Sequence, residues 1–137
     1  MENIFYQGLG FAISAAPNKI VIKITSVRNS AEIESFFVAY EKLLLGLCEK
    51  KEPTLLFVMA NKTNFNLQPK LVYQTVSGFV KLRPLSNQII TRAAALFCNN
   101  IMVKMVDKLV KKNSTEHVIP TLVSTSSCDC KKFLRRQ

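Results

Sequence analysis

Three consecutive segments define the topology of the chain: KIVIKIT (19–25), NSAEIESFFVAYEKLLLGLC (29–48) and LLFVMA (55–60). In the first segment isoleucine occupies every second position, as expected of a strand with one buried face. The last segment is an unbroken apolar run, which indicates a central strand covered on both faces. A strand, a helix and a strand in this order predict parallel pairing of the two strands.

The middle segment, 29–48, has the clearest helical pattern. Its apolar residues recur at intervals of three and four, so they lie on one side of a helix of about five turns. Asn29 precedes this helix and Glu32 follows three residues later, a spacing that resembles a capping box. The apolar stripe consists of Ile33, Phe36, Phe37, Tyr40, Leu43, Leu44, Leu47 and Cys48.

The flanking sequence continues the alternation of strands and helices. Upstream, the apolar segment 4–13 and the turn at 14–18 predict an antiparallel hairpin with the strand at 19–25. Downstream, the expected elements are a helix from Pro69 to Pro84, a buried strand over 89–98, a helix capped by Asn99 or Asn100, an edge strand over 118–123 that contains Pro120, and a short helix from about Ser127 that buries Phe133 and Leu134.

The order of these elements resembles the STAS domain family, which includes the sporulation anti-sigma-factor antagonists. LSNQIITRAAAL (85–96) resembles the strand that follows the second helix of that family. TLV (121–123) and CKKFL (130–134) resemble its final strand and closing helix. The resemblance implies a single α/β domain over 1–137, with a STAS-like mixed sheet of about five strands, an N-terminal β-hairpin and about four helices.

The resemblance also implies a role in protein–protein docking, because these domains generally act by binding. Regulatory members carry a phosphorylatable serine or threonine near an aspartate at the start of the second helix. The matching stretch, ANKTNFNL (60–67), contains no acid, and its only hydroxyl is that of Thr63. No phosphorylation site is therefore assigned.

The charge of the chain is strongly positive and unevenly distributed, with a net value of +10. Residues 1–68 hold seven Lys or Arg against six acids, whereas residues 69–137 hold twelve against three. This asymmetry indicates that one part of the surface meets an acidic partner. The apolar runs are too short to span a membrane and the N-terminus lacks a signal pattern, so a cytoplasmic protein without a membrane span is expected.

The basic residues are expected to gather on the third and last of the four predicted helices. Lysines of the third helix share the face opposite its apolar stripe, and the last helix is expected to pack nearby. A solvated helix face is the alternative interpretation. The predicted basic patch contains Lys104, Lys108, Lys111, Lys112, Lys131, Lys132, Arg135 and Arg136.

Catalytic and metal sites are not indicated by the sequence. CDC (128–130) lacks the second ligand pair that zinc needs, and Cys48 and Cys98 lie among apolar residues, where burial is expected. His117, the only histidine, has no nucleophile motif around it. With no Gly-rich phosphate loop either, we expect neither an enzyme nor a cofactor.

The expected function is that of a non-catalytic docking or scaffold module, which binds an acidic protein surface or a larger protein assembly through the basic patch. The alternative is a structural subunit of a complex that binds RNA, through its backbone, or another acidic polymer at the same patch. A third hypothesis, a carrier of a small ligand or nucleotide, requires a pocket at the strand ends near 61–66. A homodimer is a further alternative, because the edge strands at 118–123 and in the N-terminal hairpin could pair with those of a second copy.

Overall fold

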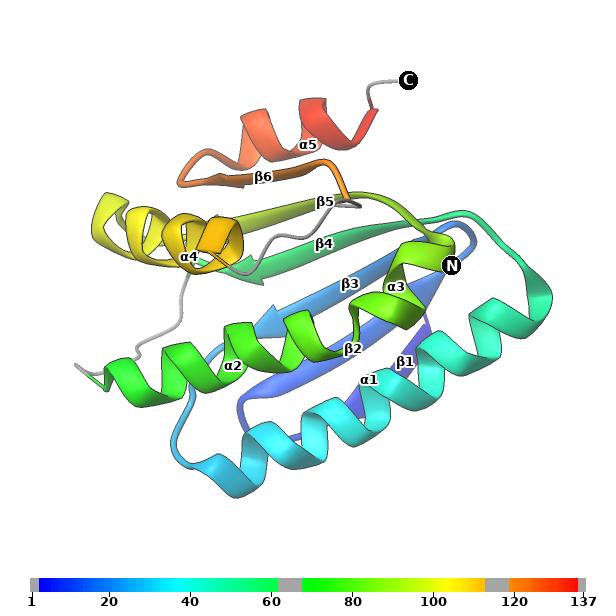
Figure 1. The fold of residues 1–137 in the computed structure, drawn as a ribbon, viewed down its shortest axis with the longest axis horizontal. Helices are drawn as coiled ribbons and strands as arrows, with labels where there is room; N and C mark the ends of the chain where they lie inside the picture. The colour runs from blue at the N-terminus through cyan, green and yellow to red at the C-terminus, as the bar shows by residue number, and fades with distance from the viewer. Residues whose placement is uncertain (1–2, 62–67, 113–118, 136–137) are drawn as a thin grey trace.

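The computed structural model describes residues 3–61, 68–112 and 119–135. These residues form six strands and five helices arranged around one mixed sheet (Figure 1). The strands are β1 (Asn3–Gln7), β2 (Phe11–Ala16), β3 (Lys19–Ile24), β4 (Thr54–Ala60), β5 (Ile90–Phe97) and β6 (Thr121–Ser124). The helices are α1 (Ser30–Lys50), α2 (Pro69–Lys81), α3 (Arg83–Ile89), α4 (Asn100–Lys112) and α5 (Ser127–Arg135).

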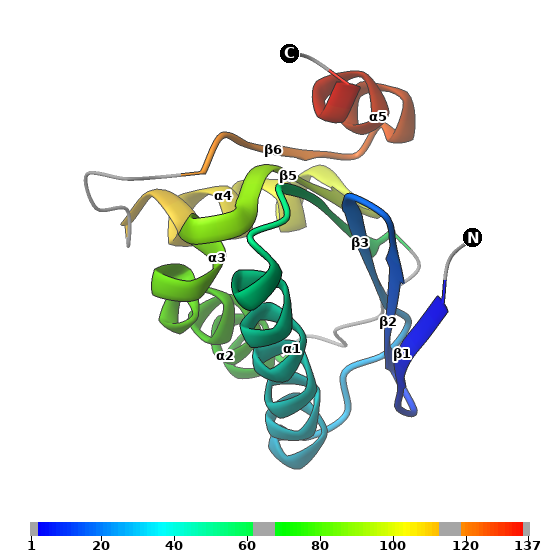
Figure 2. The ribbon, with the colours of Figure 1, turned by 90° about the vertical axis from the view of Figure 1, so that its right-hand side faces the viewer.

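The strands lie side by side in the order of the sequence, from β1 to β6. β1, β2 and β3 pair antiparallel, whereas β3 to β6 pair parallel, as the sequence predicts. Each parallel crossover advances by one strand in the same direction, and crossovers share one handedness, so the connecting helices fall on one face. Figure 2 shows α1, α2, α3 and α4 on that face and α5 on the other.

The predicted α/β class and the N-terminal hairpin are confirmed, but the structure has more elements than expected. The segment 4–13 is divided between β1 and β2, because the chain turns at Gly8 and Gly10. Gly8 N donates to the carbonyl of Phe11 at 2.8 Å, and a side chain at Gly10 would collide with the backbone oxygen of Ser26. Close packing against Ser26 therefore requires glycine at position 10.

The second difference concerns Pro84, which was expected to end the second helix. α2 does end at Lys81, but Pro84 lies in the first turn of a further short helix, α3. Proline fits a first turn because its missing N–H has no helical partner there. Pro84 therefore begins a helix as well as marking the end of another.

The principal core lies between the sheet and the helices α1 to α4, and α1 contributes its largest side chains. The helix starts as predicted, because the Asn29 side chain accepts a hydrogen bond from Glu32 N at 2.9 Å. Phe36 is completely buried and stacks on Phe11 of β2, with ring centroids 4.7 Å apart. Tyr40, one turn later, is also buried within the aromatic cluster.

A smaller core lies on the opposite face of the sheet, beneath α5. Cys130 and Leu134 of α5 are buried against Phe57, Ala94 and Leu96 of β4 and β5. β4 is thus covered on both faces, as its unbroken apolar sequence predicts. No helix among the described residues is long and apolar enough to cross a membrane.

Candidate functional site

The lysines of α4 lie on its solvent side, as predicted from their spacing. Asn99 caps the helix, with its side-chain oxygen accepting from Met102 N at 2.9 Å. Val106 is buried toward the sheet, and this orientation leaves the lysines outside. We call these four exposed residues the α4 cluster: Lys104, Lys108, Lys111 and Lys112.

The basic residues of α5 are also exposed. The hydroxyl of Ser126 accepts from Asp129 N at 3.2 Å and so caps the first turn of the helix. Burial of Cys130 and Leu134 turns the opposite side of α5 toward solvent. We call the exposed residues Lys131, Lys132 and Arg135 the α5 cluster; Arg136 lies outside the described residues.

The two clusters do not form the single helix-to-helix patch expected from the sequence. α4 packs on α2, β5 and β6, whereas α5 packs on β5 and β6 from the other face of the sheet (Figure 2). The clusters are therefore separated by the margin of the sheet, where β6 lies. The physical reason is that α5 follows the last strand and covers the apolar residues that the other helices leave open on the far face.

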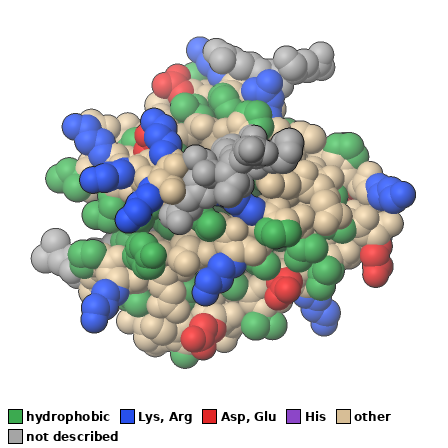
Figure 3. Space-filling view, viewed as in Figure 1, with side chains coloured by type: hydrophobic (Ala, Val, Ile, Leu, Met, Phe, Trp, Pro, Cys, Tyr) green, Lys and Arg blue, Asp and Glu red, His purple; other side chains and the backbone are tan. Residues whose placement is uncertain are grey.

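Acidic residues do little to neutralise either cluster. α4 contains Asp107, which forms an exposed ion pair with Lys111 at 2.9 Å, and α5 contains Asp129. An exposed pair at this spacing stabilises a helix by only about 0.3–0.5 kcal/mol. In Figure 3, blue side chains gather over α4 on one side of the molecule. The two helices thus retain an excess of positive charge.

β6 forms the edge of the sheet between the two clusters. Within the part of the chain that the structure describes, no strand pairs with its outer side. Pro120 precedes β6, and its carbonyl accepts from Ala93 N of β5 at 3.0 Å. The expected edge position is confirmed, but β6 begins at Thr121, after the proline, whereas the strand predicted over 118–123 contained it.

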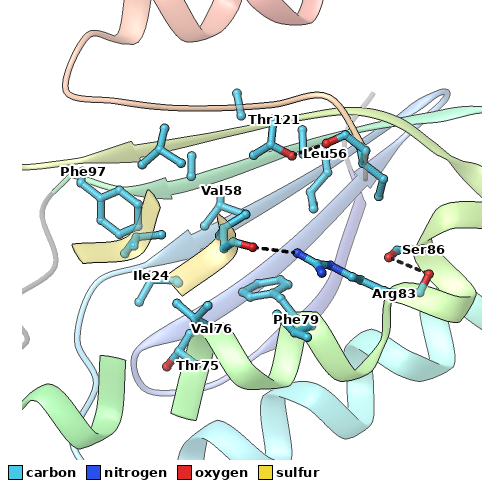
Figure 4. Close-up of a pocket in the computed structure, with 18 of the residues that line it drawn as sticks. Ile24, Leu56, Val58, Thr75, Val76, Phe79, Arg83, Ser86, Phe97 and Thr121 are labelled. Carbon is cyan, nitrogen blue, oxygen red and sulfur yellow. Dashed lines mark hydrogen bonds between the residues drawn. The ribbon is translucent and has the colours of Figure 1, made fainter. Parts of the chain in front are cut away.

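A second candidate site is an apolar cavity of about 140 Å³ between the sheet and helices α2 and α4 (Figure 4). Leu56 and Val58 of β4 lie opposite Ala93 and Ala95 of β5 in the sheet register. The two alanines are much smaller than their neighbours, which explains why space remains there. The side chain of Arg83, from α3, extends toward the sheet between the cavity walls.

No cavity at this place was predicted from the sequence. The pocket that a small-ligand carrier would require was expected near 61–66, of which 62–66 are outside the described residues. The available signal was the run AAA at 93–95 in a strand whose neighbours carry larger apolar residues.

The cysteines differ partly from expectation. Cys98 is exposed, because it follows the last residue of β5, and Cys48 is half-buried. Cys128 is exposed whereas Cys130 is buried, so the two thiols of CDC face different environments. Burial raises the pKa of the Cys130 thiol, and the neighbouring Asp129 raises it further.

Two residues that were weighed as functional candidates, His117 for catalysis and Thr63 for phosphorylation, lie outside the described residues. Over residues 3–61, 68–112 and 119–135, no three His, Cys, Asp or Glu side chains gather in a way that could hold a metal ion.

Comparison with known proteins adds no assignment. No family model, no curated protein and no solved structure matches this chain. The resemblance to STAS domains therefore stays a prediction that is based on element order and local sequence.

Proposed function

We propose that this chain is a non-catalytic, STAS-like docking module of the cytoplasm, which binds an acidic protein surface along the β6 edge. The single observation that carries the proposal is the arrangement of charge. Seven exposed Lys and Arg side chains lie on the two helices that flank the edge strand, and each helix has one acidic residue.

The arrangement favours an extended acidic segment of a protein partner. Such a segment could run beside β6, whose outer side pairs with no strand of the part of the chain that the structure describes, and still present carboxylates to both helices. Charge complementarity of this kind guides association and excludes basic partners. The division of the clusters between two faces therefore suits a partner placed at the edge between them.

The alternative, an RNA backbone or another acidic polymer, has less support from this surface. Binding of single-stranded nucleic acid usually adds aromatic side chains on which bases stack. Among residues 3–61, 68–112 and 119–135, the exposed aromatic residues are Phe5 on β1 and Tyr73 on α2, neither of which belongs to α4 or α5. Phe133 on α5 is half-buried, and the guanidinium of Arg92 lies over its ring at 5.3 Å.

The test uses charge reversal on each helix with a matched control elsewhere. The α4 variant carries Lys104→Glu, Lys108→Glu and Lys112→Glu. The α5 variant carries Lys131→Glu, Lys132→Glu and Arg135→Glu. The control carries Lys23→Glu, Lys42→Glu and Lys50→Glu, which change the net charge equally at exposed positions on β3 and α1.

Fluorescence anisotropy then measures binding of a Glu-rich peptide and of an oligouridylate of equal length, at low and at physiological salt. Loss of three exposed ion pairs at about 0.5 kcal/mol each amounts to about a tenfold weaker affinity. We expect the α4 and α5 variants each to lose about this much affinity for the peptide, and the control to lose much less.

Two results would contradict the proposal. One is peptide binding that falls equally in all three variants, since net charge alone would then explain it. The other is tighter binding of the oligouridylate with a steep dependence on salt, which counterion release would explain and which would favour the polymer alternative.

A further inference from the structure

We propose that this chain binds a second copy of itself, with an acidic face of α1 on one copy packed against the basic face of α4 on the other. The inference rests on the proposed function in one respect, because it names an acidic partner for the α4 cluster. Both faces consist of exposed side chains at helical spacing, and they carry opposite charge.

A stripe of exposed residues runs along α1 on the side opposite its buried residues. Intervals of three and four residues keep its members on one side of the helix. We call them the α1 stripe: Val38, Glu41, Leu45 and Glu49. Val38 is 70% and Leu45 is 49% exposed, and neither glutamate forms an ion pair with a residue that the structure describes. The α1 stripe therefore offers two carboxylates beside two apolar side chains.

α4 carries a basic stripe on the side opposite the buried Val106. We call its members the α4 stripe: Ile101, Lys104, Lys108 and Lys112. Ile101 is 75% exposed, and the three lysines belong to the α4 cluster. Single exposed apolar residues are common on soluble proteins. Here each stripe begins with one, which places an apolar side chain at the same end of both.

The two stripes match residue by residue. Both advance by three, four and four residues, so each spans about 16 Å at a helical rise of about 1.5 Å per residue. In a parallel alignment the pairs are Val38 with Ile101, Glu41 with Lys104, Leu45 with Lys108, and Glu49 with Lys112. This alignment joins two pairs of opposite charge and one apolar pair, and it sets a leucine against the methylene stem of a lysine.

Other alignments of the stripes fit less well. An antiparallel alignment sets Val38 opposite Lys112 and Glu49 opposite Ile101, so that charged groups meet apolar surface at both ends. The parallel alignment also avoids like charges, because Lys42 beside the α1 stripe falls level with Met105. Charge and spacing thus favour one orientation of the second copy.

The stripes of one molecule do not meet each other. α2 packs on both α1 and α4 and lies between them (Figure 1). In the same view, Figure 3 shows acidic side chains along the lower part of the molecule, where α1 lies, and basic side chains over α4. The complementary partner of each stripe is therefore the other stripe on a second copy of the chain.

The contact is small, so we expect self-association to be weak. One helix face about 16 Å long and about 10 Å wide covers about 160 Å². Even two such contacts between a pair of copies stay below the about 800 Å² per partner that stable complexes bury. Dilute protein should therefore be monomeric, so that an acidic peptide reaches the α4 cluster without competition from α1.

Sedimentation equilibrium from micromolar to millimolar protein at low salt tests the proposal. We expect the average mass of the wild type to rise above that of one chain as the concentration increases. The α1-reversed variant carries Glu41→Lys and Glu49→Lys, and the α4-reversed variant carries Lys104→Glu and Lys112→Glu. Each variant alone should associate about thirtyfold more weakly, because two attractive pairs become two repulsive pairs.

An equimolar mixture of the two variants is the decisive sample. In the mixture, α1 of one variant and α4 of the other again carry opposite charge, so association should return to about the wild-type level. Both variants remain net positive, since two reversals change the net charge of +10 by only four units. Overall charge thus opposes their association, and recovery would show contact at the reversed positions.

A control variant carries Lys23→Glu and Lys81→Glu, at exposed positions on β3 and α2. These substitutions change the net charge as the α4-reversed variant does, and the control should associate like the wild type. A wild-type mass of one chain at every concentration would overturn the proposal. A mixture no heavier than its separate components would overturn it as well.

Peptide binding separates this inference from the docking function. In dilute solution the α1-reversed variant keeps the α4 and α5 clusters, so it should bind the Glu-rich peptide at least as tightly as the wild type. If the wild type binds the peptide but never self-associates, the contact between copies is refuted and docking stands. If it self-associates but does not bind the peptide, docking at the β6 edge is refuted instead.

Discussion

Replacement of Tyr40 by phenylalanine should stabilise the folded protein. The side chain is 1% exposed, and its hydroxyl oxygen is buried with no hydrogen-bond partner. A buried polar group without a partner loses its hydration, at a cost of about 1–3 kcal/mol. Phenylalanine keeps the ring contacts with Phe36 and Phe79, whose centroids lie 5.9 and 5.5 Å away. We therefore expect a net gain of about 1 kcal/mol.

The gain can be converted into a melting temperature. Unfolding entropy of about 2.1 cal/mol/K per residue gives about 0.29 kcal/mol/K for this chain length, so the midpoint should rise by about 3–4 °C. Scanning calorimetry measures the shift directly. Tyr73→Phe is the matched control, because Tyr73 is 57% exposed and its replacement removes no buried hydroxyl. A Tyr40→Phe midpoint equal to or below that of the wild type would refute the reasoning.

Three further predictions concern pH, thiol reactivity and the second core. Burial raises the pKa of the Tyr40 hydroxyl above its ordinary value, so its contribution to stability is constant below about pH 10 and falls at higher pH; urea unfolding should show a steeper alkaline loss in the wild type than in Tyr40→Phe. Iodoacetamide should modify the exposed Cys98 and Cys128 rapidly and the buried Cys130 only on unfolding, and rapid modification of Cys130 in the folded protein, read by mass spectrometry, would contradict its placement. Leu134→Ala should lower the free energy of unfolding by about 2–3 kcal/mol in urea titrations, since Leu134 anchors α5; a change below about 0.5 kcal/mol would show that α5 is not packed on the sheet.

Several elements of the fold follow directly from sequence pattern. The periodic apolar residues of α1 and the alternation of isoleucines in β3 identify both elements, and the hydrogen bond from Glu32 N to Asn29 fixes where α1 begins. Parallel pairing of β3 with β4 follows from the helix between them. These features depend on the spacing of apolar and capping residues along the chain, which can be read from a single sequence.

Other features depend on tertiary packing and could not be derived in this way. The turn at Gly8 and Gly10 divides one apolar run into two strands, because close approach to Ser26 requires glycine there. The placement of α5 on the far face depends on which strands the preceding helices leave uncovered. For the same reason, the sequence did not reveal that α4 and α5, whose described lysines and Arg135 are exposed, pack on opposite faces of the sheet.

The cavity was missed because it results from differences in side-chain size between neighbouring strands. Ala95 is an ordinary strand residue by itself, and its significance appears only when the register sets it beside Val58 and Val123. Cross-strand register is seldom fixed by sequence for parallel strands with long connections. The lack of a partner for the Tyr40 hydroxyl likewise emerges only from the packed structure.

Chemical-shift mapping would locate the docking surface. We would titrate the wild-type protein with the Glu-rich peptide and record ¹H–¹⁵N spectra. The proposal predicts that the amide signals of β6, of the α4 cluster and of the α5 cluster change position, whereas those of α1 do not. Shifts that concentrate on α1 or on the outer face of β1 and β2, or that scatter over all exposed lysines, would contradict docking at the β6 edge.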